Sequence, residues 1–324
     1  KFWSYHDGRE PQPCLRLFIG NLMKKIMLGD GGMGTELRFR GVEVPSHVDD
    51  IWSALAITEA PEIIKNIHLD YIEAGSDYIT INNYAVTQPI LARNNISDKL
   101  EDLTLRSVEL AKDAVKESGK NTLIAGSLPP LETSYRADLI LPENQMLDYY
   151  NELVEILDNE VDIIICETMS SSSEARCALS TIQQSKSQAW VSWTLHGNRV
   201  NLLPSGEHIN EAFSDLEELK ADAYLVNCCG ANLLGQAIET LSSLTEKPIG
   251  GYANAENIIT FSSNLSNSNE AENDQKDSRL EINENEYASE VKKWMDSGAT
   301  IVGGCCRTRP THIKELNNLI AIRS

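Results

Sequence analysis

The stretch IVGGCCR, residues 301–307, runs from two strand-forming apolar residues through two glycines into two adjacent thiols. Successive side chains of a strand point to opposite faces, so neighbouring cysteines reach one point only where the backbone turns. Gly303 and Gly304 are expected to permit that turn, because glycine adopts dihedral angles closed to other residues. We interpret the stretch as the end of a buried strand followed by a turn that carries functional thiols.

A second apolar run, AYLVNCCG at 223–230, also ends in adjacent cysteines before a glycine. One buried cysteine is most simply a small core residue. Three thiols at strand ends on one rim instead favour zinc, which binds soft thiolates and, in catalytic sites, keeps its fourth position open. We predict that Cys228, Cys305 and Cys306 bind one zinc ion, whereas Cys229 points the other way and packs in the core.

Short β-branched runs alternate with longer helical periods from residue 25 onward, which is typical of βα units and a parallel sheet. Strands are expected at 26–30, 77–82, 122–125, 161–166, 189–195, 223–227, 248–252 and 299–303. Helices are expected at 61–75, 99–118, 142–159, 171–184, 207–219, 232–244 and 310–322, with a further helix before the last strand. Eight such units predict an α/β fold, a single-domain (β/α)8 TIM barrel with its functional residues at the carboxyl ends of the strands.

Composition limits the classes of partner. The chain has 324 residues, 41% of them hydrophobic, and a formal net charge of -20. Nucleic acid and anionic lipid need a basic surface, and no apolar run is long enough to span a bilayer. We therefore expect small-molecule partners, no nucleic acid and no membrane, while the oligomeric state is left open. Seven cysteines, two pairs of them adjacent, do not resemble a secreted disulfide framework and fit a reducing cytoplasm.

Two segments depart from the βα rhythm. Residues 1–25 show no clear period, so they are interpreted as a non-core leader before a barrel domain at 26–324, with Met23 or Met27 as natural starts. Residues 255–286 are rich in Asn, Ser, Asp and Glu, which indicates a long acidic polar insertion. It is either a plain surface loop, the favoured interpretation, or a lid over the site.

Polar residues also follow the first and fourth predicted strands. The run DGGMGTE at 30–36 is either a tight turn or a ligand loop whose N–H groups hold a carboxylate or a phosphate, and Asp30 can pair with a substrate ammonium. Glu167 either binds an ammonium or caps the next helix, and Cys166 beside it is a spare metal ligand. Five histidines lack metal-ligand spacing and are interpreted as loop or helix-surface residues: His47, His68, His196, His208 and His312.

These motifs together resemble the homocysteine S-methyltransferase family, in particular its short members that use S-methylmethionine or S-adenosylmethionine. The matching stretches are DGGMGTEL (30–37), IWS (51–53), HLDYIEAGSDYIT (68–80), GSLPP (126–130), CET (166–168), VNC (226–228), YANAE (252–256) and GGCCR (303–307). The combination of NC with GGCC is the most specific. The chain departs from the family at Ile81 and Asn83, where many members carry small hydroxyl residues, and at Ala253, which replaces a frequent proline.

The resemblance implies a zinc ion on the three cysteines already named. It also implies a substrate-binding set: Asp30, Gly31, Glu167, Asn227 and Asn254. Residues matching Asp30 and Glu167 contact the amino group of homocysteine, and backbone near Gly31 approaches its carboxylate. The two asparagines match family residues near the metal.

The expected reaction is zinc-dependent transfer of a methyl group from S-methylmethionine, the favoured donor, or from S-adenosylmethionine to homocysteine, which gives methionine. A free thiol has a pKa of about 8.5, and zinc binding removes its proton to leave a sulfur nucleophile. Two alternatives stay open. One is a non-catalytic barrel with a structural zinc site, and the other is a methyltransferase that accepts selenohomocysteine or another thiol.

Overall fold

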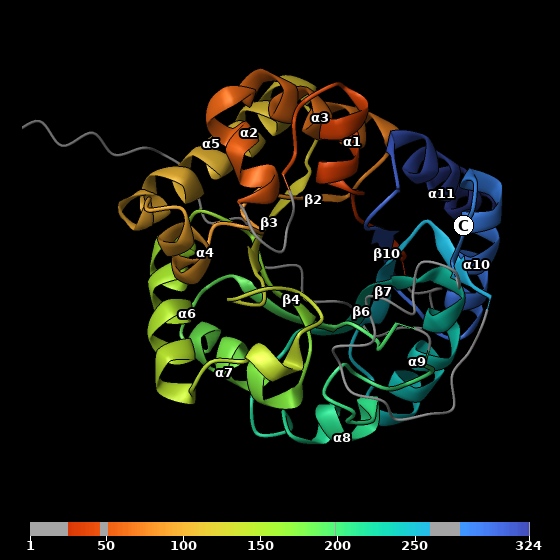
Figure 1. The fold of residues 1–324 in the computed structure, drawn as a ribbon. Coiled ribbons are helices and arrows are strands. Elements are labelled where there is room, and N and C mark those ends of the chain that lie inside the picture. The colour runs from red at the N-terminus through yellow and green to blue at the C-terminus, as the bar shows by residue number, and fades with distance from the viewer. Residues whose placement is uncertain (1–24, 46–50, 198, 260–278, 324) are drawn as a thin grey trace, which may run out of the picture.

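A ring of parallel strands surrounded by helices makes up the computed structural model, which describes residues 25–45, 51–197, 199–259 and 279–323 (Figure 1). The ring strands are β1 (Met27–Leu28), β2 (Tyr78–Thr80), β3 (Leu123–Leu128), β4 (Ile163–Met169), β5 (Gln188–Trp193), β6 (Ala223–Gly230), β7 (Ile249–Asn254) and β10 (Ile301–Gly304). Their order is β1-β10-β7-β6-β5-β4-β3-β2, and every hydrogen-bonded neighbour is parallel. The predicted (β/α)8 barrel is confirmed, with each expected strand present.

The ring is completed between β1 and β2 by hydrogen bonds that involve Asp77 and Asp30. The Leu28 N–H donates to Asp77 Oδ2 at 2.9 Å, and the Asp77 N–H donates to the Leu28 carbonyl at 2.6 Å. Further along the seam, the Thr80 N–H donates to Asp30 Oδ2 at 2.8 Å. These contacts take the place of a strand ladder and fix Asp30 at the carboxyl end of β1.

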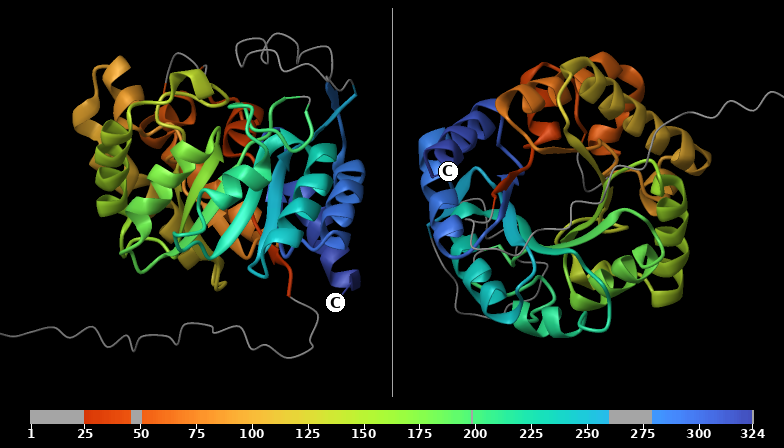
Figure 2. Two further views of the ribbon diagram at one scale, coloured as in Figure 1. Left: turned by 90° about the horizontal axis from the view of Figure 1, so that it is seen from below. Right: turned by 180° about the vertical axis from the view of Figure 1, so that it is seen from behind.

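Helices cover the outside of the ring on every side (Figures 1 and 2). They are α1 (Met33–Phe39), α2 (Leu55–Glu59), α3 (Pro61–Ala74), α4 (Gln88–Arg93), α5 (Leu100–Ser118), α6 (Glu143–Leu157), α7 (Ser172–Ile182), α8 (Ile209–Ser214), α9 (Ala231–Leu244), α10 (Glu284–Asp296) and α11 (Pro310–Arg323). The 3-10 turns are η1 (Trp52–Ala54), η2 (Ser97–Lys99) and η3 (Ala137–Leu139). Helix α3 begins at a proline and ends before Gly75, whose left-handed φ of 117° terminates it, as the sequence predicted.

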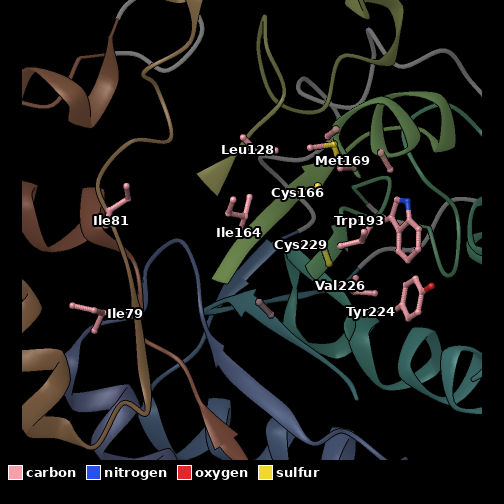
Figure 3. Packing of buried hydrophobic residues seen from close by; sticks show 14 of the residues in the cluster. Ile79, Ile81, Leu128, Ile164, Cys166, Met169, Trp193, Tyr224, Val226 and Cys229 are labelled. Atoms are coloured by element: carbon pink, nitrogen blue, oxygen red, sulfur yellow. The ribbon is translucent and has the colours of Figure 1, made fainter. Parts of the chain in front are cut away.

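Apolar side chains form two layers, one inside the barrel and one between the strands and the helices. In β4, Ile163 and Ile165 belong to the inner layer, whereas Ile164 and Cys166 belong to the outer layer (Figure 3). Inside the barrel, Tyr78 meets Trp190 edge to face, with ring centroids 5.2 Å apart. This alternation turns the residue after Cys166 inward, toward the mouth of the barrel.

Part of the predicted insertion at 255–286 has regular structure. Its two ends, β8 (Glu256–Ile258) and β9 (Arg279–Glu281), pair as an antiparallel ribbon, and α10 begins at Glu284. The part of the insertion without assigned regular structure is therefore shorter than predicted. Its central residues, 260–278, lie outside the described residues. The predicted leader lies outside them too, through residue 24. Within the described ranges, none of the helices has the length and apolarity needed to cross a membrane.

The prediction that the histidines lie in loops or on helix surfaces is wrong for three of them. His68 on α3 is fully buried, and His196 and His312 are also buried, so these three are not surface residues. Burial lowers the pKa of His68 to about 4, which keeps the ring neutral. His208 precedes α8 as its N-cap, and His47 lies outside the described residues. In the part of the chain that the structure describes, no histidine belongs to a group able to hold a metal ion.

Candidate active site

Three thiols meet at the carboxyl-terminal mouth of the barrel. Cys228 lies near the end of β6, and Cys305 and Cys306 follow β10. Their sulfur atoms all lie within 4.8 Å of one another, and the Cys228 and Cys306 sulfurs are 3.8 Å apart. Cys228 is buried, whereas the other two are partly exposed. The structure thus brings together the three cysteines predicted as metal ligands.

The backbone of β6 aims Cys228 into this cluster. Cys228 has a left-handed φ of 56°, and the register with β7 shifts between Asn227 and Gly230. A left-handed residue interrupts the regular alternation of side chains along a strand, so the directions of neighbouring side chains change at this point. Cys229 packs in the outer core, as predicted (Figure 3).

The two glycines before Cys305 act differently from the prediction. Neither Gly303 nor Gly304 has a left-handed φ, and the left-handed residue of this turn is Arg307, with a φ of 65°. The glycines provide space instead, because a Cβ on Gly304 would lie 2.3 Å from Thr308 Oγ1. The turn is therefore made at Cys306 and Arg307, and the glycines before it allow other groups to approach closely.

Cys166 is not a spare ligand at this site. Its side chain lies in the outer core, on the opposite face of β4 from the barrel interior (Figure 3). Burial raises the pKa of its thiol far above the usual range, as expected for an inert core cysteine. Cys177 is buried on α7 and also lies outside the cluster.

A cavity of about 160 Å³ opens beside the thiols and is lined by the three cysteines, Asp30 and Glu167. Residues 31–35 form part of its wall, so the glycine-rich stretch is next to the site. The stretch enters helix α1 at Met33, which the sequence had not predicted. Four tyrosines also line the cavity: Tyr78, Tyr84, Tyr135 and Tyr252.

Glu167 is a buried carboxylate at the floor of this cavity. The Ser127 hydroxyl donates to its Oε1 at 2.5 Å, and the Tyr252 hydroxyl donates to its Oε2 at 3.2 Å. Helix α7 is capped instead by Ser171, whose Oγ accepts from the Glu174 N–H at 3.1 Å. The capping alternative for Glu167 is therefore wrong, and its carboxylate is directed into the barrel mouth.

Asn83 positions Ser127, which donates to Glu167. The sequence had marked Asn83 only as a departure from the family. Its Oδ1 accepts from the Ser127 N–H at 3.0 Å, and its Nδ2 donates to the Ser127 carbonyl at 2.9 Å. Ser127 is thereby held where it reaches Glu167. Ile81, the other departure, lines the cavity directly.

The two carboxyl groups of the cavity hold their protons more tightly than exposed acids do. Burial raises the pKa of Asp30 from 3.8 to about 8, with nearby Glu167 adding to the effect. Burial likewise raises the pKa of Glu167 from 4.5 to about 7. Removal from water disfavours the charged form, so a cation brought between these groups would favour their ionisation. The site is therefore suited to an ammonium group.

Asn227 and Asn254 lie behind the cavity and bond to protein groups. Asn227 Oδ1 accepts from the Thr168 N–H at 2.9 Å and from the Ser192 hydroxyl at 2.6 Å. Asn254 Oδ1 accepts from the Cys306 N–H at 3.2 Å. Both asparagines therefore support the segments that carry the cysteines, and the structure does not bring them to the cavity wall with Asp30 and Glu167.

Tyr135 is a site residue that the sequence did not indicate. Its hydroxyl lies 2.8 Å from Cys228 Sγ and 3.0 Å from the Cys228 carbonyl. Ser127 and Tyr252 were also unassigned, but both fall inside stretches quoted for the family resemblance. Tyr135 lies in an irregular loop after β3, where neither periodicity nor a motif marks a functional residue.

The thiol cluster fits a zinc ion. Tetrahedral zinc with Zn–S bonds of about 2.3 Å places its sulfur ligands about 3.8 Å apart. The Cys228 to Cys306 distance of 3.8 Å matches that spacing. Contact with the Cys228 and Cys306 thiols, together with burial, raises the pKa of Cys305 well above its ordinary value. Three thiolates this close need a cation between them, so the donor set suits a divalent metal.

Comparison with known proteins adds independent findings. The model of the homocysteine S-methyltransferase family matches residues 27–320. Homocysteine S-methyltransferase 1 of Brassica oleracea var. italica is 28% identical over 315 residues, which cover 89% of this chain and 91% of that protein. Selenocysteine methyltransferase of Astragalus bisulcatus is 29% identical over 328 residues, covering 90% of this chain and 91% of its own.

A solved structure shares the fold closely. The metallated form of the homocysteine methyltransferase MmuM from Escherichia coli superposes with a TM-score of 0.74 at 27% sequence identity. The match covers 91% of this chain and 96% of that chain. The match to the family model at 27–320 includes the strands that carry the cysteines.

Proposed function

The chain belongs to the homocysteine S-methyltransferase family and is a methyltransferase, and from this premise we propose that it converts homocysteine to methionine with a sulfonium methyl donor and a zinc ion. The observation that carries the proposal is a three-thiol cluster facing a cavity that also contains two carboxyl groups. The cluster provides a metal site, and the carboxyl groups provide a site for an amino acid.

Cys228, Cys305 and Cys306 would hold the zinc ion. When bound, it would lower the pKa of the homocysteine thiol and so provide a thiolate at neutral pH. The cluster contains three protein ligands and faces the cavity, the arrangement of a catalytic zinc site with one open position. A structural site would have a fourth protein ligand, and none of the described His, Cys, Asp or Glu side chains joins the three.

Asp30 and Glu167 would bind the ammonium group of homocysteine, and backbone at Gly31 would approach its carboxylate. All three line the cavity beside the thiols, which supports this placement. We assign Asn227 and Asn254 an indirect role in this binding set. The Asn227 side chain ties β6, which carries Cys228, to Thr168 on β4, and the Asn254 side chain accepts from the Cys306 N–H. Holding the acceptor in a fixed orientation lowers the barrier by removing rotational freedom before the reaction.

In the transfer step, a bond forms between the homocysteine sulfur and the methyl carbon while the bond from that carbon to the donor sulfur breaks. The bonding electron pair stays on the donor sulfur, which leaves as a neutral thioether, and the thiol proton is released on binding. The tyrosines that line the cavity suit a sulfonium, because aromatic rings attract cations. Of the two sulfonium donors, we propose S-methylmethionine, the donor favoured by the family resemblance.

We place the reaction in the cytoplasm, with small molecules as partners. A reducing compartment keeps thiolate ligands available for metal. None of the six described cysteines forms a disulfide bond, as such a site requires.

In the direct test, zinc-loaded protein receives homocysteine together with one donor at a time: S-methylmethionine, S-adenosylmethionine or betaine. Methionine formation with S-methylmethionine, lost on chelation and restored by zinc, is the expected result. Bound zinc without turnover with any of the three donors would contradict the proposal.

Substitution of one metal ligand gives a sharper test. Cys305→Ser should lose high-affinity zinc binding and lower kcat by at least about a hundredfold, because serine is a poor zinc ligand. Cys177→Ser is the matched control, since Cys177 is buried on α7 and lies outside the cluster. Zinc content and methionine formation should fall together in the first variant and stay unchanged in the second. Full activity in Cys305→Ser would remove the metal from the mechanism.

A second acceptor class is supported by the selenocysteine methyltransferase among the relatives. A selenol or another thiol would occupy the same position as the homocysteine thiol. Competition between homocysteine, selenohomocysteine and selenocysteine under one donor decides between them, because the ratio of kcat/KM values measures specificity.

A further inference from the structure

Two turns at the mouth of the barrel contact each other behind the cavity wall. We call residues 30–35 the glycine turn and residues 305–309 the cysteine turn. The Gly304 N–H, just before the cysteine turn, donates to the Asp30 carbonyl at 2.8 Å. The Arg307 N–H donates to Thr35 Oγ1 at 2.8 Å, although the two residues are 272 positions apart in the chain. The turn that carries two metal ligands is thus joined to the turn proposed to bind the amino acid.

Thr308 lies at the centre of this contact. Its side chain is fully buried, with 0% exposure. Its hydroxyl donates to the Cys305 carbonyl at 2.6 Å and accepts from the Gly32 N–H at 3.1 Å. One hydroxyl group therefore satisfies a backbone group of each turn, while both Gly32 and Cys305 line the cavity in front of it.

The packing around this hydroxyl leaves no room for adjustment. A Cβ on Gly31 would lie 2.8 Å from Thr308 Oγ1, and a Cβ on Gly32 would lie 2.5 Å from the Cys305 carbonyl oxygen. Both distances are shorter than a real Cβ contact, so only glycine permits this approach. Close-packed groups transmit displacement, and a shift of either turn must therefore move the other.

We propose that Thr308 is a positioning residue that couples the metal site to the amino-acid site. Metal binding by Cys305 and Cys306 fixes the cysteine turn, and the Thr308 hydroxyl then fixes the direction of the Gly32 backbone in the amino-acid site. The inference rests on the proposed function, because it takes the cysteine turn to bind zinc and the glycine turn to bind homocysteine. Coupling between two binding sites is reciprocal, so the amino acid must strengthen zinc binding by the same factor.

The experiment uses L-2-aminobutyrate, which has the ammonium and carboxylate of homocysteine but no thiol. Its affinity is measured by calorimetry for the zinc-loaded and the zinc-free protein. Because this probe lacks the sulfur ligand, zinc acts on it only through the protein and through the charge of the site. Zinc affinity is measured by chelator competition, with and without the probe.

Wild-type protein should bind the probe on the order of tenfold more tightly when zinc is present. Thr308→Val, which removes the hydroxyl and leaves the Gly32 N–H without its acceptor, should lose most of that factor. Thr308→Ser, which keeps the hydroxyl, should retain it, and the charge of the site is the same in both variants. Thr311→Val is the control on α11, where the Thr311 hydroxyl donates to Glu284 at 2.8 Å away from the turns.

A residue with only a structural role would lower thermal stability in Thr308→Val and leave the coupling factor unchanged, which would overturn the proposal. Equal loss in Thr308→Ser and Thr308→Val would also overturn it, because the hydroxyl would not be the cause. If Thr308→Val does not fold, hydrogen exchange of the Gly32 amide in wild-type protein decides. Zinc should slow that exchange on the order of tenfold, and an unchanged rate would refute the coupling.

The same wild-type measurements separate this inference from the proposed function. Protein that binds zinc and shows the coupling but makes no methionine would refute the proposed reaction and keep the role of Thr308. Protein that makes methionine without any effect of zinc on the probe would refute the role of Thr308 alone.

Discussion

Asp30 and Glu167 determine the electrostatics of the amino-acid end of the cavity. Their pKa values in the folded protein are about 8 and about 7, against ordinary values of 3.8 and 4.5. At pH values between the ordinary and the folded pKa values, the ligand-free folded protein therefore binds more protons than the unfolded chain. By linkage, the two groups make the folded protein less stable as the pH rises through this window.

Binding of an ammonium group should reverse this balance and release protons. We expect methionine, the product, to release up to one proton from each carboxyl when it binds zinc-free protein at about pH 6.5, and little at about pH 8.5, where both groups are largely ionised. Its affinity should fall as the pH is lowered below about 7. Calorimetry in two buffers of different ionisation enthalpy measures the protons released.

Glu167→Gln should lose its share of this proton release and bind methionine on the order of tenfold more weakly. Glu174→Gln is a close control, because burial also raises the pKa of Glu174 to about 7, but its Oε2 accepts from the Ser170 N–H at the start of α7. Equal proton release from wild type and Glu167→Gln would show that Glu167 does not meet the ammonium.

The chemistry of single residues explains which parts of the site were predictable. Cysteines and acids at the ends of apolar runs have few structural reasons to be there, so Cys228, Cys305, Cys306 and Glu167 were identified from their positions. Thr308 and Tyr135 act through contacts with residues far away in the chain, such as Thr308 with Gly32 across 276 positions. A hydroxyl in a turn gives no local signal of such a partner.

At the level of elements, aspartates at the amino-terminal ends of strands stabilise the sheet. Asp77 accepts from the Leu28 N–H at 2.9 Å. Asp162 accepts from the Ile124 N–H at 2.9 Å, and Asp222 accepts from the Ala189 N–H at 2.9 Å. Each carboxylate satisfies a donor of the neighbouring strand at the end of the barrel opposite the site. In this fold, that end contributes to stability and not to catalysis.

Asp77 should matter most, because it lies at the seam where β1 and β2 form no strand ladder. Asp77→Ala leaves the buried Leu28 N–H without an acceptor and should lower the free energy of unfolding by about 1–3 kcal/mol. Asp77→Asn keeps an amide oxygen at the same place and should lose less. Urea unfolding measures both.

Asp148→Ala, at an exposed position on α6, is the control for loss of a negative charge. Methyl transfer by Asp77→Ala should stay near the wild-type rate below its unfolding transition. A drop in kcat without a change in the urea midpoint would contradict a purely structural role for this seam.

The strands and long helices were predictable because each contains enough residues to show the apolar period of its secondary structure. The short helices α1, α2 and α4 were not, since each has seven residues or fewer and their apolar pattern covers less than two turns. Helix α1 also begins within a run of glycines, whose low helix propensity favours a turn. Tertiary contacts decide such segments: the buried Glu36 of α1 accepts from Arg309 Nε at 2.5 Å.

Across the whole molecule, the core and the metal site are largely separate. The outer core packs between the strands and the helices, and the inner layer fills the barrel, with Cys305 touching only the edge of that layer. Protein groups also secure the strands beneath the cysteine turn. The Tyr287 hydroxyl on α10 lies 2.8 Å from the Gly303 carbonyl and 3.0 Å from the Ala253 carbonyl. The strands beneath the cysteine turn are therefore held by protein groups and by the packing of the barrel.

Chelation should consequently abolish activity and leave the barrel folded. Zinc at a thousand times its Kd stabilises the folded state by about 4 kcal/mol, so its removal should lower the thermal midpoint by several degrees while the far-ultraviolet circular dichroism stays the same. The midpoint of Cys228→Ser should not respond to chelator, because that variant has lost a ligand. Cooperative loss of helical signal on chelation at 25 °C would instead indicate a structural zinc site, since proteins that depend on such a site unfold without their metal.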